Sequence, residues 1–205
     1  MEDPLIANYL ESKNNMVEIG AWFRTSKYLS DKLIRDTAVN RAKNIVELGA
    51  GDGAVTKHIV ENMPENAILT VFEKNKDLYD RLEDYINKFE GSDRERIITI
   101  NDSVENMDKH IDKYGISNID SMISTLPWSN FTPEFQEEIL SMTNEKMNSQ
   151  GIFGSIAYFP GNLWGNGREF PYALKENFEE VYTSFVLRNL PPSIVYNASK
   201  PLDKE

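Results

Sequence analysis

Residues 44–56 read Asn-Ile-Val-Glu-Leu-Gly-Ala-Gly-Asp-Gly-Ala-Val-Thr. The short apolar run at the start of this stretch predicts a buried strand that begins at Asn44. Three glycines follow, and they allow a tight turn whose backbone can approach a ligand closely. A helix is expected to begin at about Ala54. The order of strand, glycine turn and helix indicates a ligand-binding turn at one edge of a sheet.

Two ligands suit such a turn, a dinucleotide and S-adenosylmethionine. The spacing Gly49-x-Gly51-x-x-Ala54 satisfies the dinucleotide fingerprint, with alanine as the third small residue. Glu73 lies 24 residues after Gly49, near the position expected for an acid that binds a ribose. The glycines alone therefore leave both ligands open.

The charge of the turn distinguishes the two ligands. A pyrophosphate carries two negative charges and prefers helix N–H groups without a nearby carboxylate, whereas this turn carries Glu47 and Asp52. S-adenosylmethionine brings a sulfonium and an ammonium group. A carboxylate can hold the ammonium, and Glu73 can accept hydrogen bonds from both ribose hydroxyls. The sequence therefore favours S-adenosylmethionine as the cofactor, with S-adenosylhomocysteine as its product.

The motifs together resemble the class I S-adenosylmethionine-dependent methyltransferases. They are Glu47-x-Gly49-x-Gly51-x-Gly53, Glu73 at the end of the next strand, and Asn101-Asp102-Ser103 at the end of the third. Three further stretches resemble the bacterial phospholipid and ornithine-lipid N-methyltransferases and, more distantly, the rRNA adenine dimethyltransferases: Arg24-Thr25-Ser26-Lys27-Tyr28-Leu29, Ser124-Thr125-Leu126-Pro127-Trp128 and Asn189-Leu190-Pro191-Pro192-Ser193-Ile194-Val195-Tyr196.

The resemblance implies a set of cofactor-binding residues. Glu47 and the glycines would meet the methionine half, Glu73 the ribose, and Asp102 with Ser103 the adenine edge. Asp102 and Ser103 also suit an ordinary helix cap, and both roles can coexist. The full expected set is Glu47, Gly49, Ala50, Gly51, Gly53, Glu73, Lys74, Asp102, Ser103, Thr125 and Leu126.

Alternating strand and helix patterns predict an α/β fold with a parallel sheet and helices on both faces. The short connection through Pro191 and Pro192 cannot hold a crossover, so the last two strands should be antiparallel. The resemblance implies a Rossmann-like, seven-stranded sheet of order 3-2-1-4-5-7-6. Strands are expected from Asn44 and at about 67–73, 96–101, 119–124, 151–159, 180–187 and 194–197. A helical extension or cap over residues 1–40, with helices from Asp3-Pro4 and at about 26–37, would precede a methyltransferase domain over 41–205.

Composition limits the classes of function. The 205 residues contain no cysteine, which excludes disulfides and thiolate chemistry, and no metal-ligand constellation is apparent. The two histidines, His58 and His110, are predicted to lie on helix surfaces. The acidic start and the lack of a long apolar run predict neither a signal peptide nor a spanning helix. We therefore expect a cytoplasmic protein, with peripheral contact to the inner membrane face left open.

The formal net charge of −11 works against binding to nucleic acid. The charge is uneven, because residues 24–43 hold six basic and two acidic side chains, a local balance of +4 that leaves −15 elsewhere. A run of charge usually marks a solvated helix face. The alternative interpretation is a local contact for phosphate headgroups beside the active site.

The acceptor is predicted to be an amine. Methyl transfer from a sulfonium needs alignment and water exclusion more than acid–base help when the amine is neutral. Adenine N6-methyltransferases begin the tetrapeptide after the fourth strand with Asn or Asp, and this chain has Thr125 there. A lipid headgroup such as phosphatidylethanolamine therefore fits better than a nucleobase.

Aromatic side chains are expected around the acceptor, because rings attract methylated cations by about 0.5–2 kcal/mol. Trp128, Tyr196 and Tyr158 are the catalytic candidates, and Trp164 is a further aromatic candidate. Core packing is the alternative for each. An rRNA adenine dimethyltransferase, a methyltransferase of a small soluble amine and a non-catalytic S-adenosylmethionine-binding module are the alternative functions.

Overall fold

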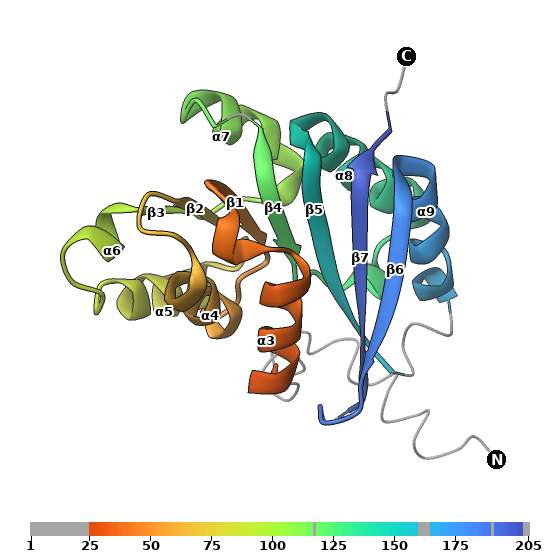
Figure 1. Cartoon of the computed structure of the whole chain (residues 1–205), viewed down its shortest axis with the longest axis horizontal. Helices are drawn as coiled ribbons and strands as arrows, with labels where there is room; N and C mark the ends of the chain where they lie inside the picture. Colours follow the sequence, from red (N-terminus) through yellow and green to blue (C-terminus); the bar gives the residue numbers. More distant parts are fainter. Residues whose placement is uncertain (1–24, 117, 160–164, 190, 203–205) are drawn as a thin grey trace.

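One twisted sheet runs through the computed structural model, which describes residues 25–116, 118–159, 165–189 and 191–202 (Figure 1). Its strand order is β3-β2-β1-β4-β5-β7-β6, as the sequence predicts. The strands are β1 (Asn44–Leu48), β2 (Ile68–Phe72), β3 (Ile97–Ile100), β4 (Ile119–Ser124), β5 (Met147–Tyr158), β6 (Phe178–Val186) and β7 (Ser193–Pro201).

Strands β3, β2, β1, β4 and β5 pair in parallel, whereas β7 is antiparallel to both β5 and β6. The antiparallel end predicted from the prolines is therefore confirmed. In the central register Leu48 lies opposite Phe72 and Ser124, and Phe72 lies opposite Ile100. Since these residues end their strands, the segments that follow them emerge in one row at one edge of the sheet.

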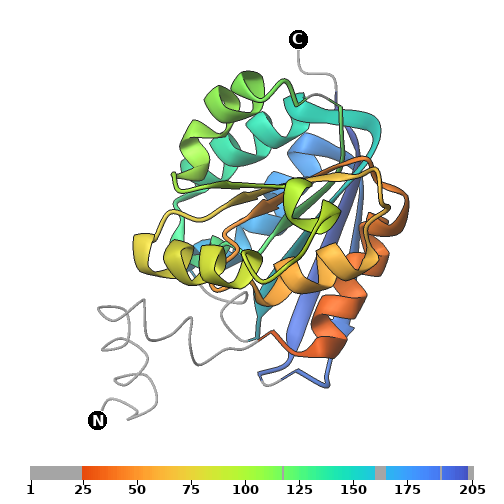
Figure 2. The ribbon, with the colours of Figure 1, turned by 90° about the vertical axis from the view of Figure 1, so that its left-hand side faces the viewer.

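Helices cover both faces of the sheet, as Figure 2 shows edge-on. One face packs against α3 (Lys27–Asp36), α4 (Ala54–Asn62) and α5 (Lys76–Ile86), and the other against α7 (Met107–Lys113), α8 (Pro133–Lys146) and α9 (Phe170–Asn177). A separate hydrophobic cluster fills each interface. The shorter helices are α6 (Ser92–Glu95), η1 (Val39–Arg41), η2 (Val104–Asn106), η3 (Trp128–Asn130) and η5 (Gly165–Arg168).

Helix α3 is part of the packed core. Leu29 and Leu33 are fully buried in the cluster shared with α4, and Gly154 of β5 lies directly beneath the helix. The hydroxyl of Ser26 caps α3 by accepting from the backbone N–H of Leu29. The division of the chain near residue 40 stays a prediction. The expected N-terminal helix from Asp3-Pro4, together with Arg24 and Trp164, lies outside the described residues.

Two strand boundaries differ by four residues from those predicted. Strand β5 begins at Met147 rather than Gly151, because Met147 pairs with Ile119 of β4 ahead of a register shift between Ile119 and Ser121. Strand β7 continues to Pro201 rather than Asn197, because Ser199 pairs with Ile152 and Pro201 with Phe178. No helix in the described part of the chain has the length and apolarity needed to cross a bilayer.

Candidate active site

The glycine turn lies after β1, in the row of segments that leaves the carboxyl ends of the parallel strands. Gly49, Gly51 and Gly53 have φ values of 77°, 61° and 91°, a region that favours glycine. The N–H groups of Gly49 and Ala50 both donate to the carbonyl of Phe72, at 2.9 and 3.1 Å. A Cβ on Gly51 would meet no atom within 4 Å. The turn is therefore held on one side and open at Gly51.

Glu47 is a fully buried carboxyl group at the end of β1. Its Oε2 accepts from the hydroxyl of Thr56 on α4 at 2.6 Å, whereas its Oε1 has no hydrogen-bond partner in the structure. Burial raises the pKa of Glu47 to about 8, against the opposing effect of the Thr56 hydrogen bond and with a further upward contribution from Glu73. A buried acceptor without a partner suits a cationic ligand group, because a cation satisfies both the hydrogen bond and the charge.

Glu73 follows β2 and fixes two turns at once. Its Oε2 accepts from the N–H of Gly51 at 2.8 Å, and its Oε1 accepts from the N–H of Asn75 at 2.7 Å. Only 7% of Glu73 is exposed. Each carboxylate oxygen can accept a second hydrogen bond, so two hydroxyls of a ligand can still bind here.

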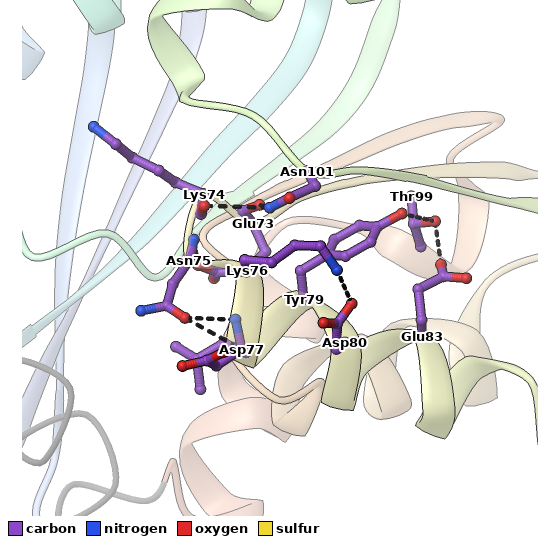
Figure 3. A network of polar contacts seen from close by, with 11 residues as sticks. Glu73, Lys74, Asn75, Lys76, Asp77, Tyr79, Asp80, Glu83, Thr99 and Asn101 are labelled. Atoms are coloured by element: carbon purple, nitrogen blue, oxygen red, sulfur yellow. Dashed lines mark hydrogen bonds and ion pairs between the residues drawn. The ribbon is translucent and has the colours of Figure 1, made fainter.

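The segment after β2 is bound to the segment after β3 (Figure 3). The Asn101 side-chain amide donates to the carbonyls of Glu73 and Lys74, at 2.8 and 3.2 Å. Asn75 then caps α5 by accepting from the N–H groups of Asp77 and Leu78. The Lys74 ammonium is well exposed and lies 4.0 Å from Glu105. This network makes the Glu73 carboxylate part of a rigid edge.

Asp102 follows β3 and is held by its own neighbours. Its Oδ1 accepts from Ser103 N–H at 2.7 Å and from the Asn106 side chain at 2.9 Å, and its Oδ2 lies 2.7 Å from Nε2 of His110. The hydrogen bonds from His110, Asn106 and Ser103 lower the pKa of Asp102 to about 2, although partial burial opposes them. Asp102 is therefore ionised at neutral pH, with its carboxylate at the edge of the sheet.

Three residues of this edge were missed in the sequence: Thr56, Asn75 and His110. His110 is 23% exposed rather than on the helix surface, and its ring meets Phe72 edge-on at 5.9 Å between centroids. No spacing rule indicates the His110–Asp102 pair, because the short η2 turn between them sets the orientation of α7. Asn75 does carry a signal, since asparagine before a charged helical turn is a common cap.

Thr125 and Leu126 come from the end of β4 and lie against the glycine turn. The Thr125 hydroxyl donates to the carbonyl of Gly49, and its N–H donates to the carbonyl of Leu48 at 3.0 Å. A Cβ on Gly49 would lie 2.8 Å from Cδ2 of Leu126. Thr125 thus fastens the turn to β4, and glycine at position 49 allows that close approach.

Two of the catalytic candidates, Trp128 and Tyr196, are packed in the core on the α8 and α9 side. They are 3% and 5% exposed, and both rings contact Phe170. Trp128 stacks on Phe170 with centroids 4.3 Å apart, and its Nε1 donates to the Ser124 hydroxyl at 3.1 Å. The Phe170 side of the Trp128 ring and its N–H are thus already engaged, so this arrangement fits the core-packing alternative. Their catalytic role stays a prediction.

Tyr158, the third candidate, lies in the cluster on the opposite face, with α3. Its phenol oxygen is 3.3 Å from the Thr25 hydroxyl. Burial raises the pKa of Tyr158 above its ordinary value of 10, and the hydrogen bond with Thr25 only partly offsets this. The structure therefore separates Tyr158 from Trp128 and Tyr196, although Tyr158 ends β5 at the same edge as the glycine turn.

The row of side chains at this edge suits a cationic nucleoside. Glu47 offers an unpartnered carboxyl oxygen, Glu73 has spare acceptor capacity, and Asp102 is a third acid. The described residues contain no group of histidines and acids arranged to hold a metal ion. A doubly negative pyrophosphate would have to approach the acids Glu73 and Asp102, which opposes the dinucleotide alternative.

Comparison with known proteins agrees with this assignment. No protein-family model matches the chain. The chain is 27% identical over 172 residues to the ornithine lipid N-methyltransferase of Singulisphaera acidiphila, a match that covers 84% of this chain and 83% of that enzyme.

Solved structures share the fold at low sequence identity. The precorrin-6y C5,15-methyltransferase of Geobacter metallireducens has a TM-score of 0.65 and 15% identity, with 87% of this chain and 94% of that chain covered. The O-methyltransferase TomG of Streptomyces achromogenes, solved with S-adenosylmethionine, has a TM-score of 0.67 and 10% identity, with coverages of 85% and 81%. In sequence the chain therefore resembles a lipid N-methyltransferase, and in fold it resembles S-adenosylmethionine-dependent methyltransferases, as its sequence predicts.

Proposed function

We propose that the chain transfers a methyl group from S-adenosylmethionine to the amine of a lipid headgroup. The observation that carries the proposal is the match to an ornithine lipid N-methyltransferase over 84% of the chain. The phosphatidylethanolamine amine predicted from the sequence and an ornithine lipid amine share the same acceptor chemistry, a primary amine on a lipid. Either acceptor would bring the enzyme to a membrane surface.

In this proposal the cofactor lies along the row of turns after β1, β2 and β3. Glu47 holds the ammonium through its unpartnered Oε1, and the open side of Gly51 admits the methionine backbone. Glu73 accepts from the ribose hydroxyls while it keeps Gly51 and Asn75 in place. Asp102 with Ser103 receives the adenine amine. Ala50, Gly49, Gly53, Lys74, Thr125 and Leu126 complete the surroundings of the cofactor.

The bound cofactor supplies an electrophilic methyl group. The protein then has to position a neutral amine in line with that group and exclude water. Tyr158 is suited to position the amine, because its raised pKa keeps the phenol protonated at neutral pH and able to donate or accept a hydrogen bond. Trp128 and Tyr196 would shape the pocket from the core behind it.

The acceptor side of the site favours a lipid amine over adenine. The Thr125 hydroxyl is bonded to the Gly49 carbonyl, so it does not replace the Asn or Asp that adenine N6-methyltransferases use for the exocyclic amine. The net charge of −11 also opposes binding to rRNA. We propose in addition that residues 1–40 act as a cap over the domain that begins at residue 41.

The test is incubation of the purified protein with methyl-labelled S-adenosylmethionine and one acceptor at a time. The acceptors are phosphatidylethanolamine or ornithine lipid in detergent micelles, free ethanolamine, and rRNA. We expect label in one or both lipids. A Tyr158→Phe variant should lose most of kcat and retain cofactor affinity, because only the phenol is removed.

Label only in ethanolamine would replace the lipid proposal with a soluble amine, and label only in rRNA would replace it with the adenine dimethyltransferase alternative. Absence of label from every acceptor, with tight S-adenosylmethionine binding retained, would indicate the non-catalytic module. Unchanged kcat in Tyr158→Phe would remove Tyr158 from the acceptor site.

A further inference from the structure

Exposed apolar side chains gather at the carboxyl edge of the sheet. Seven large apolar side chains of the described residues are exposed, and four of them lie where α3 meets the turn between β6 and β7. Tyr28, Phe185 and Leu187, which are 55%, 69% and 78% exposed, line one shallow depression. Phe159 is 45% exposed, and its N–H donates to the carbonyl of Pro192 in the same turn. Apolar residues grouped in this way mark an interaction site more often than scattered ones do.

Basic side chains line the same depression. Lys32, Arg35 and Arg188 line it together with one acid, Asp31, and a second acid, Asp36, forms ion pairs with Lys32 and Arg35 beside it. Arg35 is 70% exposed, and the Arg188 guanidinium lies over the ring of Tyr28 at 5.3 Å from its centroid. We name Tyr28, Lys32, Arg35, Phe185, Leu187 and Arg188 the aromatic-basic patch. A locally basic patch on a chain of net charge −11 indicates an anionic partner at this place.

The patch adjoins the edge of the candidate active site. Val186 of β6 pairs with Ser193 of β7, and Ser193 pairs with Tyr158 at the end of β5. Figure 1 shows α3 and the β6–β7 turn together at the lower end of the sheet, where β5 also ends. A lipid surface that contacts the patch would therefore present its headgroups beside Tyr158.

We infer that the aromatic-basic patch docks the enzyme onto an anionic lipid bilayer. This inference rests on the proposed lipid acceptor and adds the surface and the charge of the membrane. Aromatic rings and leucine insert at the interface of a bilayer, and arginine and lysine bind its anionic headgroups. The acidic remainder of the protein is then screened from the bilayer, because the Debye length is only about 8 Å at physiological ionic strength.

The experiment is vesicle co-sedimentation of the full chain with two lipid compositions. One set of vesicles is phosphatidylcholine alone, and in the other part of it is replaced by phosphatidylglycerol. We expect binding to the anionic vesicles to weaken roughly tenfold in Tyr28→Ser/Leu187→Ser, and at least as much in Arg35→Glu/Arg188→Glu. Added salt should weaken wild-type binding.

The chain offers a matched control at the opposite end of the sheet. At the C-terminal end of α7, the Lys113 ammonium lies over the Tyr114 ring at 5.3 Å, and Tyr114 is 44% exposed. The Lys113→Glu/Tyr114→Ser variant thus removes a similar pair elsewhere and should bind anionic vesicles as the wild type does. Circular dichroism and methylation of the micelle-dispersed lipid should be unchanged in all three variants, which excludes misfolding.

Patch variants that bind anionic vesicles like the wild type would overturn the inference, as would equal binding to both lipid compositions. A patch variant that changes the oligomeric state, measured by light scattering, would assign the patch to a second copy of the chain and also overturn it. Patch-dependent vesicle binding without label in any lipid would leave the docking surface standing and refute the proposed acceptor. Methylation of lipid in micelles, without vesicle binding that depends on the patch, would support the proposed acceptor and refute the docking surface.

Discussion

Glu73 is the residue on which the cofactor edge depends most directly. Its two oxygens hold the N–H groups of Gly51 and Asn75, at 2.8 and 2.7 Å, and retain capacity for the ribose hydroxyls. Replacing it with alanine removes both functions. We predict that Glu73→Ala weakens S-adenosylmethionine binding by about 1.5–3 kcal/mol, the range for hydrogen bonds to a charged group. Isothermal titration calorimetry measures the change.

Glu73→Gln is a smaller change at the same position. The amide keeps one oxygen acceptor of similar shape, so the variant should bind S-adenosylmethionine less well than the wild type and better than Glu73→Ala. Glu83, on the outer part of the same network, bonds the Thr99 hydroxyl and provides the control, because Glu83→Gln should leave affinity unchanged. Wild-type affinity in Glu73→Ala would remove this carboxylate from the cofactor site.

Glu47 should make stability depend on pH. Its pKa rises from 4.5 to about 8 in the folded chain, so the folded state binds a proton more tightly than the unfolded state. The free energy of unfolding should therefore fall as pH rises from 4.5 to 8 and level off above that, with a slope of up to about 1.4 kcal/mol per pH unit. Urea denaturation at several pH values tests this, with Glu47→Gln as the variant that lacks the titration. If the free energy of unfolding changed with pH in the same way in the wild type and in Glu47→Gln, the raised pKa of Glu47 would be contradicted.

The same carboxyl links cofactor binding to protons. If the ammonium of the cofactor binds Glu47, the carboxyl must ionise, and a proton is released near neutral pH. Calorimetry in two buffers of different ionisation enthalpy counts the released protons. The Glu47→Gln variant measures the protons that the ligand itself releases on binding. The wild type should therefore release more protons per bound cofactor than this variant. Equal release would place the ammonium elsewhere.

At the scale of elements, the close contact between α3 and β5 depends on the absence of a Cβ at Gly154. A Cβ on Gly154 would overlap Cγ2 of Thr37 and approach Cδ1 of Leu33 to 3.0 Å. We predict that Gly154→Ala lowers the free energy of unfolding by about 1–3 kcal/mol, because α3 must move off the sheet. Chemical denaturation provides the measurement.

Thr37→Ser offers a specific rescue of this variant. Serine lacks Cγ2 and keeps the hydroxyl that donates to the Leu33 carbonyl at 2.8 Å. The Gly154→Ala/Thr37→Ser double variant should therefore be more stable than the sum of the two single changes predicts. Strict additivity would show that the methyl group of Thr37 is not the obstacle.

The elements that carry the candidate site were predictable because β1, β2 and β3 are short, mainly apolar runs, each followed by a polar or glycine residue. That pattern placed Glu47, Glu73 and Asp102 at strand ends, and parallel pairing then brings such ends together. The longer β5 was not predictable, since its start depends on pairing with Ile119 after a register shift. Helix α6 was missed because four residues carry too little periodicity.

The separation of the aromatic candidates also depends on register. Tyr158 pairs with Ser193 and Tyr196 with Ser155, so the two tyrosines come from different strands and their faces follow from the β5–β7 alignment. Trp128 stacks on Phe170, which belongs to α9 and lies more than forty residues further along the chain. A single sequence shows the residue types but not these long-range contacts.

At the scale of the whole molecule, charge repulsion should make stability depend on salt. The chain carries 33 acidic and 22 basic side chains, and its isoelectric point is about 4.8. Salt screens the net repulsion, which destabilises the compact state, and also screens the surface ion pairs, which stabilise it. Exposed ion pairs such as Lys57–Glu61, at 3.8 Å, are worth only about 0–1 kcal/mol each, so at pH 8 relief of repulsion should prevail.

We therefore predict that potassium chloride raises the thermal unfolding midpoint at pH 8 by a few degrees. Near pH 5 the net charge is close to zero, so the same salt should leave the midpoint unchanged or lower it, because only the ion pairs are then screened. Scanning calorimetry with and without salt measures the midpoint at both pH values, and the measurement near pH 5 serves as the control for the one at pH 8. A lower unfolding midpoint with salt at pH 8 would mean that the stabilising ion pairs outweigh the net repulsion. The acidic side chains would then be paired well enough that their mutual repulsion contributes little to stability.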